Sequence, residues 1–220
     1  MKKQVIIVAG GSGKRMGAVQ PKQFLVIAGK PVLMHTIERF STFDQSMQII
    51  VALPETYFDF WKSLCKKYDF HEEHVLARGG LKRFDSVKAG LSFAGREGLI
   101  AVHDGVRPLV DKNTIGRVFE VAAKKGNAIP VVPVSQSVRL VGPEGNRPFD
   151  RRQLRMVQTP QCFHAGVLQD AYLQEYRTDF TDDATVVESL GKAIHLTEGN
   201  SENIKVTKPA DLRMAESLLR

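Results

Sequence analysis

A short apolar run that leads directly into a glycine-rich basic loop constrains this chain more than any other feature. Residues 5–9 read Val-Ile-Ile-Val-Ala, and residues 10–17 read Gly-Gly-Ser-Gly-Lys-Arg-Met-Gly. An unbroken apolar run bounded by glycines is typical of a buried strand in a parallel sheet. Glycines let an anion approach the backbone N–H groups, and Lys14, Arg15 and Lys22 add positive charge. The stretch therefore indicates a polyphosphate-binding loop.

Two familiar phosphate-binding loops fit these glycines poorly. The dinucleotide fingerprint needs Gly-x-Gly-x-x-Gly, whereas Gly11, Gly13 and Gly17 are spaced Gly-x-Gly-x-x-x-Gly. The Walker loop needs Gly-Lys followed by Ser or Thr, but Arg15 follows Lys14. A glycine-rich turn without a ligand is a third alternative. Nearby cations with no acid among them make it the less favoured one.

The size and composition of the chain favour one folded domain spanning residues 1–220. A chain of 220 residues suits one well-buried α/β domain, and a hydrophobic content of 43% excludes a disordered protein. We expect a soluble, cytoplasmic protein without a membrane partner, because no apolar run is long enough to cross a bilayer. Cys65 and Cys162 lie far apart, so neither a disulfide framework nor a zinc site is expected.

The net charge of +7 permits nucleic-acid binding, but the distribution of the cations favours a smaller partner. A nucleic-acid-binding domain usually gathers Lys and Arg on one helix face or stripe. Here many cations fall in predicted loops that follow strands: Lys14, Arg15, Lys22, Arg83, Arg107 and Lys205. Such loops converge at one edge of an open α/β sheet. We therefore expect a small, highly charged anion and no nucleic acid.

Alternating strand and helix patterns predict a mostly parallel mixed sheet with helices on both faces. Strands are expected near residues 5–9, 24–28, 47–53, 75–77, 99–103, 128–134, 193–196 and 204–206. Helices are expected near residues 31–40, 54–68, 83–94, 113–125, 166–176 and 182–190, and from residue 209. Residues 135–153 lack helical periodicity and carry a Gly-Pro-Glu-Gly-Asn turn, which predicts a β-hairpin arm. A hairpin is marginal alone, so it should pack on something, such as a second subunit.

Asp104 is the best candidate for a metal ligand. It closes the predicted strand 99–103, and magnesium is commonly held by one or two carboxylates plus substrate phosphates. A helix cap or a turn is the equally weighted alternative. His103 should point to the opposite face and belong to the core. Lys205, in the predicted strand 204–206, either points to solvent or reaches an active site.

A second glycine-rich turn precedes the predicted helix 83–94. Residues 79–80 are Gly-Gly, and Arg83 and Ser86 follow, so the turn offers free amides to an anion or a base carbonyl. Arg83 could contribute to such a site or could equally pair with Asp85 or Glu97.

Other polar clusters favour structural roles. The acids at 182–183 fit a helix N-terminus, and the His-Glu-Glu-His stretch at 71–74 fits an exposed loop better than a zinc site. The sequence has no Gly-x-Ser-x-Gly nucleophile motif.

Taken together, these blocks resemble the 2-C-methyl-D-erythritol 4-phosphate cytidylyltransferase family, which has the Rossmann-like nucleotidyltransferase fold. The similarity runs along nearly the whole chain, in six blocks with suitable spacing. They are residues 9–16 with Pro-Lys-Gln at 21–23, residues 79–87, residues 102–108, Asp-Arg at 150–151 with Gln-Thr-Pro-Gln at 158–161, Thr-Asp-Asp at 181–183, and residues 203–207.

The resemblance implies a transfer of CMP from CTP to 2-C-methyl-D-erythritol 4-phosphate with release of pyrophosphate, a step of non-mevalonate isoprenoid synthesis. By this resemblance, Arg15 and Lys22 would stabilise the transition state, and Asp104 would bind Mg²⁺. Arg151 and Lys205 would position the acceptor phosphate. The residues that would hold CTP are Ala9, Gly10, Gly11, Ser12, Gly13, Gly80 and Ser86. Those near the polyol phosphate would be Arg107, Ser137 and Thr159.

The resemblance also implies a homodimer in which each hairpin arm reaches into the neighbouring active site. Arg151 and Ser137 would then act in trans. Three departures concern substrate contacts: Val-Ala-Gly-Gly at 8–11 replaces Pro-Ala-Ala-Gly, Gln-Ser at 136–137 replaces Asp-Thr, and Leu81 stands where some members carry an acid. The related ribitol-5-phosphate cytidylyltransferases are the first alternative. A Rossmann oxidoreductase and a nucleic-acid-binding domain are more remote.

The chemistry implied by this resemblance agrees with the residues present. A phosphate monoester is largely dianionic at neutral pH, so the nucleophile needs no general base. The obstacle is to bring two anions together and to accommodate charge on the α-phosphoryl group and the leaving pyrophosphate. Fixed cations and positioning address that obstacle directly.

Overall fold

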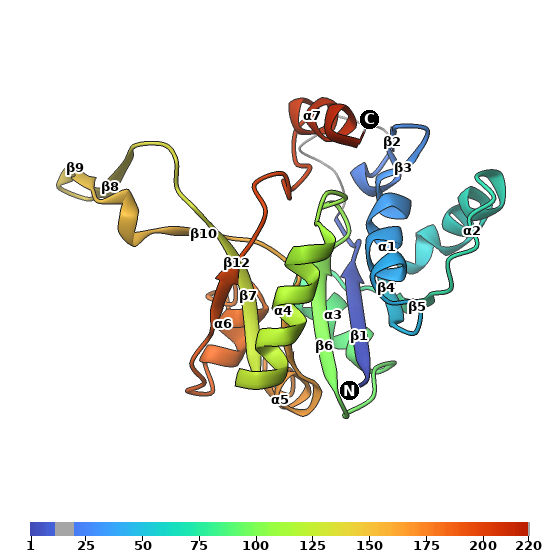
Figure 1. Ribbon diagram of the computed structural model, residues 1–220, viewed down its shortest axis with the longest axis horizontal. Coiled ribbons are helices and arrows are strands. Elements are labelled where there is room, and N and C mark those ends of the chain that lie inside the picture. Colours follow the sequence, from blue (N-terminus) through green and yellow to red (C-terminus); the bar gives the residue numbers. More distant parts are fainter. Residues whose placement is uncertain (12–19, 220) are drawn as a thin grey trace.

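One twisted sheet organises the chain in the computed structural model, which describes residues 1–11 and 20–219 (Figure 1). Within these residues eight strands form the sheet, in the order β10-β7-β11-β6-β1-β4-β5, with β12 pairing with β7. Their bounds are β1 Lys3–Val8, β4 Gln48–Leu53, β5 Val75–Arg78, β6 Leu99–Asp104, β7 Asn127–Pro133, β10 Arg155–Val157, β11 Gln161–His164 and β12 Leu196–Glu198. The block β5-β4-β1-β6 is parallel, whereas β11 runs antiparallel to β6 and β7. The expected mixed, largely parallel sheet is confirmed.

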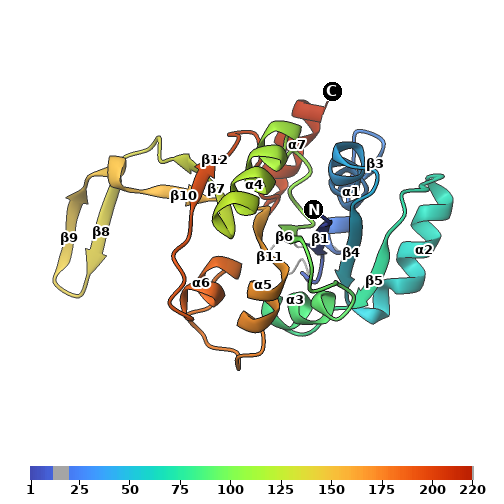
Figure 2. The same ribbon diagram turned by 60° about the horizontal axis from the view of Figure 1, so that its bottom comes forward.

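Helices cover both faces of this sheet (Figures 1 and 2). Val5 and Ile7 of β1 belong to one core cluster with residues of α1, α2 and α4, whereas Ile6 belongs to a second cluster with residues of α3, α5 and α6. Burial on both faces explains why the strand is apolar throughout rather than alternating. The helices are α1 Val32–Phe43, α2 Phe58–Lys67, α3 Arg83–Leu91, α4 Lys112–Lys125, α5 Ala165–Ala171, α6 Asp183–Glu188 and α7 Pro209–Leu219.

Strand register brings several loop starts to one level at the carboxyl edge. Val8 of β1 lies opposite Ala52 of β4 and Asp104 of β6. Leu53, the last residue of β4, lies opposite Arg78, the last residue of β5. The loops after these strands therefore begin side by side, as an open parallel sheet requires.

A two-stranded hairpin interrupts the sheet between β7 and β10. Strand β8 (Val138–Gly142) pairs antiparallel with β9 (Gly145–Phe149), and the 3-10 turn η4 (Arg151–Gln153) follows. Figure 1 shows this segment projecting from the body of the molecule. Its side chains are largely exposed, and Val141 keeps 76% of its surface accessible. We call residues 135–154 the arm.

Several element boundaries differ from those expected. Residues 204–206 form no strand, and their one ladder-like bond runs from the Val206 N–H to the Val106 carbonyl over 2.9 Å. Strand β12 begins only at Leu196, and α5 ends at Ala171. Asp111 caps α4, so the helix begins earlier than expected, at Lys112. In the described part of the chain, no helix is long and apolar enough to cross a membrane.

Short elements complete the fold. The 3-10 turn η2 (Lys22–Phe24) leads into β2 (Val26–Ile27), which pairs with β3 (Lys30–Pro31), and η3 (Glu55–Tyr57) precedes α2. The expected strand at 24–28 is therefore only two residues long. Phe24 is almost fully buried against Tyr57, Phe60 and Trp61, which anchors η2 to the sheet body.

Candidate active site

A cavity of about 390 Å³ opens where the loops after β1, β5 and β6 meet. Many of the residues expected to bind nucleotide or to act in the reaction line it: Ala9, Gly10, Gly11, Lys22, Gly80, Ser86, Asp104 and Lys205. Lys82 and Arg83 add two further cations to the wall. Ser12, Gly13 and Arg15 lie outside the described residues. The fold thus brings cations and backbone amides from segments far apart in sequence to one edge of the sheet.

Close packing excludes a side chain at Gly80 and leaves little room for one at Gly10. A Cβ on Gly80 would lie 2.3 Å from the Cβ of Asp85, and a Cβ on Gly10 would lie 3.2 Å from the Oγ of Ser86. Ser86 is itself buried and donates its hydroxyl to the Lys82 carbonyl over 3.1 Å. The two glycine turns therefore pack against each other through Ser86, and they leave backbone rather than side chains facing the cavity.

Asp104 is the one carboxylate in the described cavity wall, and three cations surround it. Its Oδ2 lies 2.9 Å from Lys205 Nζ and 3.2 Å from Arg107 Nε, and its Oδ1 lies 3.5 Å from Arg83 Nε. Burial alone would raise the pKa of Asp104, but the charges of Arg83, Lys205 and Arg107 hold it well below the usual range. Asp104 is therefore ionised at any physiological pH, and it orders the cations around it.

The backbone of Asp104 is held from behind by a buried hydrogen-bond chain. The Asp104 N–H donates to Thr159 Oγ1 over 3.1 Å, and this hydroxyl donates to His103 Nδ1 over 3.0 Å. His103 Nε2 in turn donates to the Arg107 carbonyl over 3.1 Å. Burial lowers the pKa of His103 to about 4, so the ring is neutral and fits this tautomer. His103 packs on Phe40, which confirms its expected place in the core.

Arg107 and Thr159, expected near the acceptor, lie beside the cavity rather than in its wall. Arg107 reaches Asp104 and donates from Nη1 to the Asn203 carbonyl over 2.7 Å. Thr159 is buried, with its hydroxyl engaged by Asp104 and His103. In this structure both side chains support Asp104.

Gln23 clamps the loop that carries Lys22 to the end of β1. It is almost fully buried, and its Nε2 donates to the Ala9 carbonyl over 2.7 Å. The bond fixes η2 beside the glycine loop, and Lys22 Cε lies 3.6 Å from where a Cβ on Gly11 would stand. In the sequence, Gln23 stands out only as part of the Pro-Lys-Gln motif at 21–23, and the motif alone predicts no role for it. A glutamine next to a candidate lysine was the available signal.

The expected partners of Arg83 were wrong. Arg83 donates from Nη1 and Nη2 to Asp183, over 2.9 and 2.7 Å, across 100 positions of sequence. Asp85 instead accepts from the Lys82 N–H over 3.2 Å at the start of α3. Asp183 was assigned to a helix N-terminus, which is correct, but no local pattern signals its long-range ion pair.

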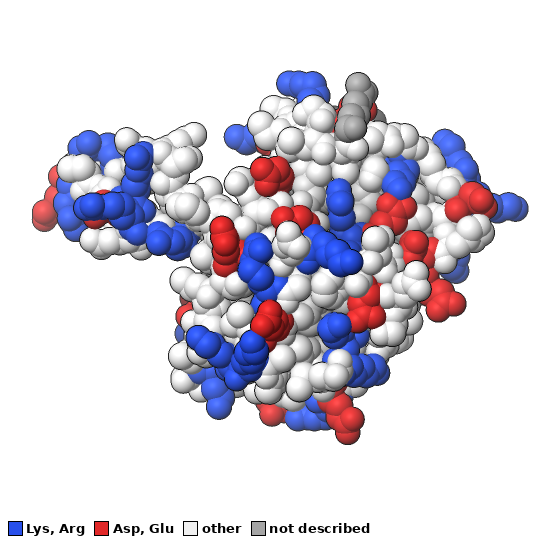
Figure 3. All heavy atoms as spheres, in the orientation of Figure 1, with Lys and Arg blue, Asp and Glu red and all other residues white. Residues whose placement is uncertain are grey.

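Arg151 and Ser137 lie on the arm, outside the cavity of their own chain (Figure 1). Both are exposed, and Arg151 Nη1 donates to the Ser135 carbonyl. The arm and its return strand carry a concentration of positive charge (Figure 3), contributed by Arg139, Arg147, Arg151, Arg152 and Arg155. A single chain therefore separates these two expected acceptor contacts from the rest of the site.

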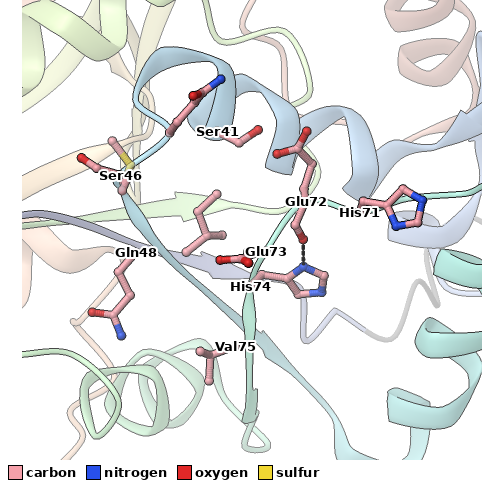
Figure 4. Close-up of a pocket in the computed structure, with 11 residues that line it drawn as sticks. Ser41, Ser46, Gln48, His71, Glu72, Glu73, His74 and Val75 are labelled. Carbon is pink, nitrogen blue, oxygen red and sulfur yellow. Dashed lines mark hydrogen bonds between the residues drawn. The ribbon is translucent and has the colours of Figure 1, made fainter.

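A second hollow, of about 840 Å³, lies near the amino ends of β4 and β5 (Figure 4). It contains the His-Glu-Glu-His stretch at 71–74. His74 donates from Nδ1 to the Glu72 carbonyl over 2.6 Å and accepts the Trp61 Nε1–H at Nε2 over 2.8 Å. Both ring nitrogens are engaged in structural bonds. His74 is therefore a structural residue of this hollow, in line with the structural role expected for this stretch.

Comparisons with known proteins agree with this geometry. A sequence profile of the 2-C-methyl-D-erythritol 4-phosphate cytidylyltransferase family matches residues 4–220. A curated protein of that name from Bacteroides thetaiotaomicron is 50% identical over 219 residues, with both chains fully covered. The crystal structure of the Thermus thermophilus enzyme of that name has a TM-score of 0.77 at 32% identity, covering 99% of this chain and 98% of that one. The Francisella tularensis structure has a TM-score of 0.81 at 28% identity, with 99% of each chain covered.

Proposed function

The chain belongs to the 2-C-methyl-D-erythritol 4-phosphate cytidylyltransferase family, and on that premise we propose how its carboxyl-edge cavity transfers CMP from CTP to 2-C-methyl-D-erythritol 4-phosphate. The protein is a nucleotidyltransferase of isoprenoid biosynthesis. The observation that carries the assignment of the site is the convergence of glycine backbone, Lys22 and Lys205 around Asp104. The named relatives favour methylerythritol phosphate over ribitol 5-phosphate as the acceptor.

CTP would lie along the two glycine turns. Backbone groups of residues 9–11 and of Gly80 would face the nucleotide, with Ser86 fixing the turns against each other. Ser12 and Gly13, which lie outside the described residues, stay expected contacts of CTP. Because these turns present backbone rather than side chains, a triphosphate can approach closely. Lys22 from η2 would then lie beside the phosphates, in a position fixed by the bond between Gln23 and the Ala9 carbonyl.

The acceptor phosphate would enter beside Lys205. The Lys205 side chain is 41% exposed, although its ammonium contacts Asp104, and it lines the cavity. Arg107 is more deeply placed and would act from behind Asp104. Thr159 is buried next to Asp104 and would contribute by accepting a hydrogen bond from the Asp104 backbone N–H.

The reaction itself needs charge stabilisation more than proton transfer. An oxygen of the acceptor phosphate attacks the α-phosphorus of CTP, the bond to the β-phosphate oxygen breaks, and pyrophosphate leaves with the electron pair. The attacking monoester is already largely dianionic, so no base is required. Lys22 and Arg15 would stabilise the charge that develops on the α-phosphoryl and leaving groups, and Lys205 and Arg151 would hold the nucleophile in line.

Magnesium would be held mainly by the triphosphate, with Asp104 as its protein ligand. One carboxylate is within the usual requirement of Mg²⁺ when substrate phosphates supply the other ligands. Asp104 is ionised at physiological pH, and the distance from its Oδ1 to Arg83 Nε is 3.5 Å, longer than the contacts of its Oδ2 with Lys205 and Arg107, so Oδ1 fits the role. The ion would supply charge neutralisation on the phosphates.

Arm exchange in a homodimer would complete the site. The arm projects from the body and carries exposed Leu140 and Val141, which a partner would cover. It also carries Arg151 and Ser137, which are far from the cavity of their own chain and would reach the partner's cavity instead. The unpaired cysteines Cys65 and Cys162, together with the use of CTP, favour a cytoplasmic location.

Pyrophosphate release provides the direct test of the proposed function. Purified protein with CTP and Mg²⁺ should release pyrophosphate when methylerythritol phosphate is added, and at least about tenfold more slowly with ribitol 5-phosphate, because a site built around one polyol's hydroxyls loses hydrogen bonds with another. Omission of the acceptor is the control. Equal rates with both acceptors would contradict the acceptor assignment, and no release with either would contradict the function.

A further inference from the structure

A buried carboxylate that does not line the cavity holds one of the cavity's cations. Asp183, the first residue of α6, has no exposed surface. Its Oδ1 accepts from Arg83 Nη1 over 2.9 Å and from the Tyr172 hydroxyl over 2.6 Å, and its Oδ2 accepts from Arg83 Nη2 over 2.7 Å. The Arg83 side chain is 27% exposed and forms part of the cavity wall.

Arg83 connects this buried carboxylate to Asp104. A guanidinium is planar and rigid, so fixing its two Nη atoms also fixes the direction of Nε. In Arg83 this Nε faces Asp104 Oδ1 at 3.5 Å. The other oxygen of Asp104, Oδ2, contacts Lys205 at 2.9 Å and Arg107 at 3.2 Å. Burial opposes the charge of Arg83, but Asp183 and Asp104 raise its pKa above the ordinary value, so the link stays charged.

The α6 N-terminus has a separate anchor that does not involve the Asp183 carboxylate. Gln161 of β11 donates to Asp182 Oδ2 over 2.8 Å and accepts the Ala184 N–H over 2.9 Å. Asp182 caps the helix by accepting the Thr185 N–H over 2.9 Å. The helix start is therefore held by Gln161 and by its own cap. The distinctive contribution of the Asp183 side chain is its pair of hydrogen bonds with Arg83.

We propose that Asp183 is a positioning residue, which acts through Arg83 to set the orientation of the Asp104 carboxylate and so the positions of Lys205 and Arg107. This inference rests on the proposed function, in which Lys205 acts on the acceptor phosphate and Arg107 supports Asp104 from behind. Without the Asp183 carboxylate, Arg83 would turn its fork onto Asp104 and compete with Lys205 for it. Lys205 would then leave the position in which it serves the acceptor phosphate, and Arg107 the position in which it supports Asp104, although every residue of the cavity wall is still present.

The replacement Asp183→Asn tests this positioning role. It keeps the size of the side chain but removes the negative charge and replaces one of the two acceptor oxygens with an NH₂ donor. We expect kcat/KM for methylerythritol phosphate to fall by about tenfold or more, since small misplacements of reacting groups cost up to about 10²-fold. Binding of CTP alone, measured by calorimetry, should change by less than about threefold.

The matched control is Tyr172→Phe, which removes the other hydrogen bond to Asp183 and keeps the ring stack on Phe84 at 4.7 Å. It should keep kcat/KM within about threefold of the wild type, because Asp183 keeps both of its hydrogen bonds to Arg83 without the Tyr172 hydroxyl.

A double-mutant cycle separates positioning from simple destabilisation. In an Arg83→Gln background, Asp183→Asn should cause almost no further loss of kcat/KM, because the residue through which it acts is gone. An equal loss in both backgrounds overturns the proposal. So does an Asp183→Asn protein with wild-type kcat/KM, or one whose only change is tighter CTP binding from the removed negative charge.

Arg83→Lys keeps the proposal testable if Asp183→Asn does not fold. Lysine retains the charge but cannot hold two carboxylates with a fixed fork, so the same acceptor-specific loss is expected at a near-native unfolding temperature. Full activity of Arg83→Lys overturns the inference. Failure of the proposed function is distinguishable, because there the wild-type protein itself would release no pyrophosphate.

Discussion

At the scale of single residues, the site is a set of cations ordered around one carboxylate. Lys205, Arg107 and Arg83 all contact Asp104, and the hydroxyl of Thr159 holds its backbone. Asp104 was predictable because it ends an apolar strand. Arg83 was not assigned correctly, because its partner Asp183 lies 100 positions away and both residues also fit local roles at helix starts.

Lys22→Ala should lower turnover by about 10²-fold or more, the usual cost of removing one preorganised group that stabilises charge in the transition state. The bond from Gln23 to the Ala9 carbonyl should keep η2 in place, so CTP binding should change far less. Steady-state pyrophosphate release and calorimetric CTP binding measure the two effects. Lys66→Ala, on the last turn of α2 and away from the cavity, is the matched control. A folded Lys22→Ala protein with unchanged turnover would show that Lys22 is not catalytic.

Asp104→Asn should raise the Mg²⁺ concentration needed for half-maximal activity by about tenfold or more, in line with the cost of losing a charged metal ligand. It should also weaken Mn²⁺ binding in the presence of CTP, measured by electron paramagnetic resonance, which does not depend on turnover. Asp111→Asn is the control, because asparagine caps α4 nearly as well as aspartate and the residue lies outside the cavity. Unchanged Mn²⁺ binding in Asp104→Asn would remove Asp104 from the metal site.

At the scale of elements, the sequence predicted strands better than it predicted their ends. The strand at β1 was evident because both faces are buried, which makes it apolar throughout. Residues 204–206 also contain apolar side chains but form no strand, and Val206 packs with Ile27, Val32 and Val106 in a small third cluster, separate from the two clusters that contain β1 residues. A short apolar run reports burial, and burial alone does not select a strand.

Gly90→Ala should destabilise the fold by about 1–3 kcal/mol, the usual cost of overpacking. A Cβ at this position in α3 would lie 2.6 Å from Ile6 Cγ2 in β1, so the helix would have to move away from the sheet. Because α3 also carries Arg83 and Ser86, kcat/KM should fall as well. Urea unfolding and pyrophosphate release measure the two effects.

Gly116→Ala in α4 is the matched control for that prediction. Its new Cβ would find its nearest neighbour, Phe43 Cε2, at 3.6 Å, which is ordinary contact. Alanine should therefore stabilise this helix by about 0.5–1 kcal/mol and leave activity unchanged. Equal destabilisation by both replacements would show that close packing of α3 on β1 is not the cause.

At the scale of the whole molecule, the sheet gathers the residues of the cavity, and the arm carries Arg151 and Ser137, the two proposed acceptor contacts that lie outside it. Residues 9–11, 22, 80, 86, 104 and 205 meet in one cavity because parallel strands end at the same edge. Arg151 and Ser137 lie on the projecting arm, and in this structure they do not line the cavity of their own chain. The sequence indicated the arm through its loss of helical periodicity. The proposal that the arm serves the cavity of a second chain concerns contacts between subunits, about which periodicity carries no information.

Subunit mixing tests that arrangement. If Arg151 acts in trans, Arg151→Ala and Lys22→Ala proteins should each be nearly inactive alone, but a heterodimer of the two should contain one cavity with both residues intact. Random re-association of equal amounts gives about half heterodimers, each with one competent site of two, so about a quarter of wild-type activity is expected if the sites are independent. Differently tagged subunits, purified through both tags, allow the activity of the heterodimer alone to be measured.

Wild-type subunits mixed with the doubly substituted protein serve as the control, since an arm that acts in cis would leave activity only in the wild-type subunit. A verified Arg151→Ala/Lys22→Ala heterodimer without activity would place Arg151 in its own chain's site and would require the arm to fold back onto the body.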